Sequence, residues 1–116
     1  MQLRHLDEHR VAEILAFGGA ELREELRADL ERCAARLQDS IASPIDSSKL
    51  RAEMQRKILH ELRGIAATIG ADPLAAFSKE VENQLQTAET SMIEMACAKI
   101  ADTCLILSRQ IAGMEV

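Results

Sequence analysis

A histidine, an arginine and a glycine stand close together in the segment HELRGIAATIGADPL, residues 60–74. If this segment is helical, His60 points about 150° away from the centre of the apolar stripe and is therefore exposed. A glycine costs about 1 kcal/mol relative to alanine inside a helix, so Gly64 indicates that a reactant must approach His60 closely. An accessible imidazole nitrogen is a nucleophile. We therefore interpret His60 as a candidate nucleophile.

The segment around this histidine is basic. Between residues 49 and 63 the chain has five basic residues and two acidic ones, a local charge of +3 in a protein whose net charge is −5. The basic residues are Lys49, Arg51, Arg56, Lys57 and Arg63, and the acidic ones are Glu53 and Glu61. Such a surface attracts anions. The alternative for Arg63 and Lys57 is an ordinary solvated helix surface.

A carboxylate is expected opposite His60 on the next helix. If the chain forms a helical hairpin that turns near Ala71, residues 60 and 82 are both eleven positions from the turn and face each other. Glu82 could then accept a hydrogen bond from Nδ1–H of His60, which leaves Nε2 unprotonated and nucleophilic. The alternative is that Glu82 is a plain surface acid.

Helices must position these residues, because apolar residues recur at helical spacing along the chain. The 116 residues are 47% hydrophobic and include two aromatic residues, and the low aromatic and β-branched content argues against a sheet. We expect a single domain, residues 1–116, with an all-α fold. Its predicted architecture is an up-and-down four-helix bundle with a short N-terminal covering helix.

Capping residues and glycines predict the ends of these helices. Asp7 is the expected N-cap of the covering helix, with Leu6 and Val11 as a hydrophobic staple. This helix stops at Gly18 and Gly19, and a second helix covers residues 20–39. Residues 40–48 form a loop, in which Asp46 or Ser47 caps the third helix.

The remaining helices follow from the same signals. The third helix ends at Gly70 in a left-handed cap, and Asp72 caps a fourth helix that begins with Pro73. Thr90 or Ser91 opens the last helix. The predicted inward residues of the third helix are Leu50, Met54, Ile58, Leu62, Ile65 and Ile69. Those of the last two helices are Leu74, Phe77, Val81, Leu85, Ile93, Cys97, Ile100, Cys104, Leu107 and Ile111.

Several classes of function are disfavoured. The negative net charge argues against nucleic acid as a ligand. The three cysteines are expected to be reduced core thiols of a cytoplasmic protein, and no apolar run is long enough for a membrane span. His5 and His9 are four residues apart, but no third metal ligand is nearby. The chain has no glycine-rich phosphate loop, so we expect no kinase activity.

The segment beginning at His60 resembles the signature of histidine phosphotransfer (HPt) domains. This signature has an apolar residue two positions after the histidine, a basic residue at three, glycines at four and ten, and leucine at fourteen. Here these residues are His60, Leu62, Arg63, Gly64, Gly70 and Leu74. Glutamine or glutamate is typical at the twenty-second position, which Glu82 occupies. The N-terminal part is similar to the first two helices of the family, and Leu59 departs from it because a small residue is usual there.

The resemblance implies a phosphorelay intermediate. Nε2 of His60 would accept a phosphoryl group from an aspartyl phosphate on a receiver domain and pass it to another receiver. The chain would hold no cofactor, and the receiver domain of a response regulator or hybrid kinase would supply Mg²⁺. Arg63, with lesser help from Arg56 and Lys57, would offset phosphoryl charge. The predicted docking residues are Leu59, Arg56, Lys57, Ala67 and Leu15.

Two other interpretations are open at this point. A bundle of this type could bind a receiver or a kinase without phosphotransfer, as an inhibitor or scaffold, and the apolar residues near His60 would then matter more than the imidazole. An unrelated four-helix adaptor is the other alternative. We expect a monomer in each case.

Overall fold

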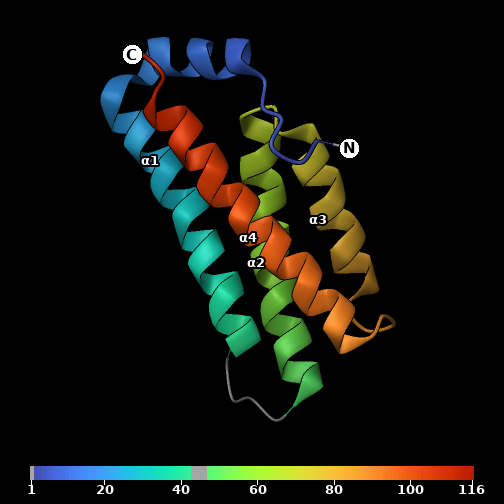
Figure 1. Ribbon diagram of the computed structural model, residues 1–116. Helices are drawn as coiled ribbons and strands as arrows, with labels where there is room; N and C mark the ends of the chain where they lie inside the picture. Colours follow the sequence, from blue (N-terminus) through green and yellow to red (C-terminus); the bar gives the residue numbers. More distant parts are fainter. Residues whose placement is uncertain (1, 43–46) are drawn as a thin grey trace.

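Four α-helices pack as a bundle in the computed structural model, which describes residues 2–42 and 47–116 (Figure 1). They are α1 (Glu8–Ala42), α2 (Ser48–Thr68), α3 (Asp72–Gln84) and α4 (Thr90–Ala112). Each helix packs against the next one along the chain, and α1 also packs against α4. Successive helices run in opposite directions (Figure 1), and the described residues contain no strand. The predicted all-α, up-and-down architecture is confirmed.

A bend divides α1 into two parts. At Gly19 the backbone has φ 68° and ψ −162°, in the region that only glycine adopts without strain. The residues before the bend lie across one end of the bundle, and those after it run beside α4 (Figure 1). This first part is the predicted covering helix, and its predicted end at Gly18 and Gly19 is confirmed.

The covering helix is tied to the end of α2. Oδ1 of Asp7 accepts a hydrogen bond of 3.0 Å from the backbone N–H of Arg10, as predicted for an N-cap. This bond lowers the pKa of Asp7 below its usual value of 3.8. The guanidinium of Arg10 donates to the carbonyl of Ala67 at 3.1 Å, and the N–H of Asp7 donates to the carbonyl of Ile69 at 3.2 Å.

Gly70 allows the start of the covering helix to approach the end of α2 closely. Its φ is 70°, so the predicted left-handed cap of α2 is confirmed. A Cβ atom at this position would collide with Cβ of Asp7. The glycine therefore serves two purposes, because it ends α2 and leaves room for the start of the covering helix.

The caps of α2 and α3 differ in how well the sequence predicts them. Oγ of Ser47 accepts a hydrogen bond from the N–H of Leu50 at 3.2 Å, as predicted, and the alternative cap Asp46 lies outside the described residues. The predicted cap Asp72 is wrong, because Ala71 is the N-cap of α3 and Asp72 is already helical. In the first turn its carboxylate still interacts favourably with the helix dipole.

The second part of α1 is longer than predicted and continues to Ala42. Ser40, assigned to the loop from the sequence, is helical and buried. Its hydroxyl donates to the carbonyl of Leu37 at 2.6 Å and accepts a hydrogen bond of 3.2 Å from Nε2 of Gln55 on α2. This pairing of two buried polar side chains extends the contact between α1 and α2, which the sequence alone did not indicate.

The core is apolar and uses all four helices. Its largest fully buried side chains are Val11, Leu15, Leu30, Leu37, Ile58, Leu59, Leu62, Ile69, Leu74, Ile100, Leu107 and Ile111. The three cysteines are free and buried, as predicted. Burial raises the pKa of Cys33 and Cys97 to about 11 and that of Cys104 to about 12. No helix in the described ranges has the length and apolar character needed to cross a membrane.

The buried side of α2 differs from the predicted one. Leu50 and Met54 are exposed, so their predicted inward position is wrong. Residues spaced by four drift about 40° per step around a helix, so a stripe drawn at constant spacing leaves the core side. Apart from Ile58, which is also buried, the buried residues alternate between spacings of three and four: Ala52, Gln55, Leu59, Leu62, Ala66 and Ile69.

Candidate functional site

His60 lies in the middle of α2 and projects into solvent, as predicted. Its side chain is 70% exposed, whereas Ile58, Leu59 and Leu62 beside it are buried in the core. The backbone that carries the imidazole is therefore held firmly by packing, while the ring itself is open to a reaction partner.

Glu82 on α3 faces His60 across the helix pair. Oε1 of Glu82 lies 3.6 Å from Nδ1 of His60, which confirms that residues 60 and 82 are in register. This distance exceeds that of a hydrogen bond, so the predicted direct Nδ1–H···O bond is not formed. The Glu82 side chain is only 13% exposed. The carboxylate that faces the ring is therefore poorly solvated.

Arg63 binds the other oxygen of the same carboxylate. Its Nη1 donates to Oε2 of Glu82 at 2.9 Å. One carboxylate thus lies between the imidazole and the guanidinium, and each of its oxygens is directed to one of them. The sequence-based expectation that Arg63 offsets phosphoryl charge differs from the contact in the structure, where Arg63 orients Glu82.

An open hollow adjoins His60 between α2 and α3. It is lined by His60, Arg63, Gly64, Ala67, Ala75, Ala76 and Lys79. Most of these residues are glycine or alanine, so the side chains beside the ring are small and leave it accessible. A Cβ atom at Gly64 would have no neighbour within 4 Å. Packing therefore does not require this glycine, which agrees with the interpretation that it leaves access to the histidine.

Lys79 is a residue of this hollow that sequence reasoning missed. It lies on α3, is exposed, and forms no ion pair with any residue in the described part of the chain. The register of the helical hairpin could have predicted this position, because residues 63 and 79 are both eight positions from Ala71. Lys79 is therefore opposite Arg63, just as Glu82 is opposite His60.

Arg56 and Lys57, the two basic residues nearest to His60 on its N-terminal side, are exposed, as predicted. Nη2 of Arg56 lies 2.6 Å from Oε1 of Glu53, so its charge is largely compensated within the helix. Hydrogen bonding to this guanidinium lowers the pKa of Glu53. Ala67, another predicted docking residue, is exposed and lines the hollow.

The prediction is wrong for two of the docking residues. Leu59 and Leu15 are fully buried and offer no surface to a partner. Leu59 is buried because α2 packs against both α1 and α3, which widens the buried arc of the helix. Leu15 lies on the inward side of the covering helix, within the same core as Val11.

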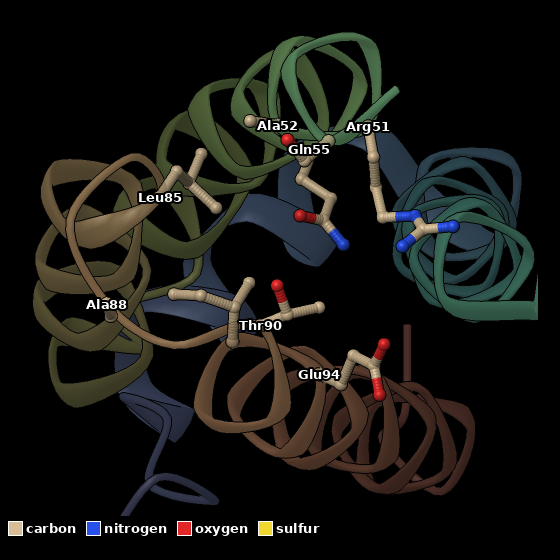
Figure 2. Close-up of a pocket in the computed structure, with 9 residues that line it drawn as sticks. Arg51, Ala52, Gln55, Leu85, Ala88, Thr90 and Glu94 are labelled. Atoms are coloured by element: carbon tan, nitrogen blue, oxygen red, sulfur yellow. The ribbon is translucent and has the colours of Figure 1, made fainter. Parts of the chain in front are cut away.

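A second cavity lies at the other end of the bundle, away from the covering helix. Figure 2 shows Gln55 reaching into it from α2 and Thr90 and Glu94 lining it from α4. Its enclosed part has a volume of about 40 Å³, enough for water. The adjoining hollow of about 360 Å³ has no His, Cys, Asp or Glu among the described residues that line it. Within the described ranges no three His, Cys, Asp or Glu side chains are grouped to hold a metal ion. The hollow beside His60 is therefore the candidate site.

Comparison with known proteins gives a family match for most of the chain. The family model described as Hpt domain matches residues 20–112. The match begins directly after the bend at Gly19 and ends with α4, so it covers the bundle and leaves out the covering helix. No curated protein and no solved structure matches the chain. Because the matched residues include the complete bundle and the exposed His60, the chain belongs to the Hpt domain family, the histidine phosphotransfer domains of phosphorelays.

Proposed function

We propose that this protein is a phosphorelay intermediate whose phospho-acceptor is His60. It receives a phosphoryl group from the aspartyl phosphate of one receiver domain and transfers it to the aspartate of another. The observation that carries this proposal is the placement of His60: the ring is exposed on a rigid helix, with a carboxylate near Nδ1 and an open hollow beside it.

The proposed transfer is a nucleophilic substitution at phosphorus. The lone pair of Nε2 forms a bond to phosphorus as the bond between phosphorus and the aspartyl oxygen breaks. The receiver's carboxylate leaves with the electron pair, and Nδ1 of His60 keeps its proton. The ring therefore becomes positively charged while it carries the phosphoryl group, and the reverse steps return it to the neutral form.

Glu82 has a clear role in this step. Its carboxylate lies 3.6 Å from Nδ1 and opposes the positive charge that develops on the ring. Arg63 holds the other carboxylate oxygen at 2.9 Å and compensates the charge of a side chain that is largely shielded from water. Glu82 and Arg63 thus act as positioning residues, whereas His60 alone forms the covalent bond.

The chain itself supplies a nucleophile and a docking surface. Hpt domains are phosphocarriers, and we propose that this one has no kinase activity and takes Mg²⁺ and the acidic pocket from its receiver partner. Arg56, Lys57 and Ala67 are exposed around His60 and form the proposed docking surface. A cytoplasmic location and a monomeric state complete the proposal.

The direct test is transfer from receiver domains phosphorylated with acetyl phosphate. Wild-type protein should gain an acid-labile, alkali-stable phosphoryl group, and His60→Gln should gain none. The His60→Gln variant should keep its helicity and melting temperature, because the side chain is exposed. Binding of a receiver without labelling of the wild-type protein would instead support the scaffold function. Labelling of His60→Gln would refute the assignment of His60 as the phospho-acceptor.

A further inference from the structure

The basic residues near His60 differ in whether a carboxylate already compensates them. Arg63 is bound to Glu82 at 2.9 Å, and Arg56 is bound to Glu53 at 2.6 Å. Lys79 and Lys57 are exposed and have no such partner in residues 2–42 and 47–116, and of the two only Lys79 lines the hollow beside His60. An anion that arrives at His60 can therefore be neutralised by Lys79 without the loss of an existing ion pair.

The position of Lys79 also fits this role. Lys79 and His60 line the same hollow, whereas Arg56 lines a neighbouring hollow with Glu82 and Asn83 to which His60 does not contribute. Nδ1 of His60 is directed to Glu82, so Nε2 lies at the opposite edge of the ring. A group attached to Nε2 points away from the carboxylate, and the hollow beside Gly64 has room for it.

We propose that Lys79 binds the phosphoryl oxygens of phosphorylated His60. This inference rests on the proposed function and deepens it, since it assigns the phosphoryl-binding charge to α3. The ε-ammonium is a compact charge with three donors on a flexible stem, and it can follow the phosphoryl group as a receiver approaches or leaves. Arg63 remains on Glu82, because its departure would leave a largely shielded carboxylate uncompensated.

The experiment uses phosphoramidate as a small phosphodonor, so that no partner protein contributes. The Nε2–P bond forms as the P–N bond of the donor breaks and ammonia leaves. Phosphorylated wild type, Lys79→Gln, Lys79→Arg and Lys57→Gln are then titrated by ³¹P NMR, which follows the last ionisation of the phosphoryl group. Lys57→Gln is the matched control, because it removes the same charge from an exposed residue that lines neither hollow.

A bound cation stabilises the dianionic phosphoryl group, so its removal must raise the pH at the titration midpoint. For Lys79→Gln we expect an upward shift of about 0.5 pH unit at low salt and a smaller one at high salt, where exposed charges are screened. Lys79→Arg should keep the wild-type midpoint, and Lys57→Gln should shift it less than Lys79→Gln. Melting temperatures should stay unchanged, since both lysines are exposed.

The outcomes separate this inference from the proposed function. Equal midpoints for wild type and Lys79→Gln would overturn the assignment of Lys79, as would equal shifts for Lys79→Gln and Lys57→Gln, which indicate only a general basic surface. If wild-type protein carries no phosphoryl group on His60 at all, the proposed function itself fails.

Discussion

His9 on the covering part of α1 and His60 on α2 both lie beside a glutamate, but in different surroundings. Nε2 of His9 is 2.7 Å from Oε1 of Glu13, one turn further along the same helix, and the two side chains are 85% and 67% exposed. Nδ1 of His60 is 3.6 Å from Oε1 of Glu82, which belongs to another helix and is 13% exposed. The shorter contact is thus the more solvated one.

The two pairs differ in how firmly the carboxylate is held and how far it is shielded from water. An ion pair between two solvated side chains contributes little, because water screens it and both side chains remain free to rotate. Glu82 is held by α3 and by Arg63, and so presents a fixed charge to the ring. Two helices packed in register create this arrangement, whereas His9 and Glu13 lie on the solvent-exposed side of one helix.

The largest expected difference between these regions is in labelling by a phosphodonor. His60→Gln should abolish incorporation, whereas His9→Gln should leave it at the wild-type level. Peptide mapping at alkaline pH, where a phosphohistidine survives, identifies the labelled residue. Label on His9 in the wild-type protein or in His60→Gln would contradict the comparison. It would show that exposure alone is sufficient for an imidazole to be phosphorylated.

The second difference concerns the two glutamates. Glu82→Ala should lower the rate of phosphotransfer about tenfold, since the positive ring loses its fixed countercharge. Glu82→Gln should retain more activity, because an amide oxygen can still accept the hydrogen bond from Arg63. Glu13→Ala is the matched control on the covering helix. Single-turnover transfer from a phosphorylated receiver measures the rates, and equal rates for Glu82→Ala and Glu13→Ala would refute the role of Glu82.

Gly64 provides a third, smaller test, because here stability and function should move in opposite directions. The added Cβ of Gly64→Ala meets no neighbour within 4 Å, so the free energy of unfolding should rise by up to about 1 kcal/mol. Transfer should slow about twofold to fivefold as the methyl group narrows the approach to His60, and Gly64→Leu should slow it further. Urea denaturation and single-turnover kinetics check both parts, and unchanged rates in both variants contradict the access argument.

The smallest expected effect is a pH dependence of local stability that is confined to the covering helix. The hydrogen bond from Arg10 lowers the pKa of Asp7 in the folded protein below its ordinary 3.8. The cap therefore stabilises the helix above about pH 4 and loses this contribution as the pH falls further, because the unfolded state then binds more protons. Hydrogen exchange should show residues 8–18 losing protection in acid before α2 does.

Asp7→Asn is the control for this prediction. An asparagine side chain still caps a helix but does not titrate, so the early loss of protection in acid should disappear. Protection that declines equally in the variant and the wild type would mean that the cap is not the cause.

Local sequence patterns determined where the helices of this protein bend and end and which side of α2 carries His60. The exposure of His60, the bend at Gly19, the left-handed cap at Gly70 and the burial of Leu6 and Val11 all follow from helical periodicity or from residue chemistry within a few positions. The facing of residues 60 and 82 also follows, because a short turn between antiparallel helices leaves only one register. These features depend on neighbours along the chain, which the sequence contains directly.

Only the tertiary structure decided how far burial extends around each helix. Leu59 and Leu15 are buried and Leu50 is exposed because a helix buries as wide an arc as its packed neighbours cover. The same holds for charge: Arg63 pairs with Glu82 on α3, and Lys79 has no ion-pair partner among the described residues, because the packing of α2 against α3 decides which charged groups lie within reach. Periodicity gives the direction of a side chain from its own axis, but contact between side chains depends on the distance and rotation between axes, which packing of the whole bundle sets.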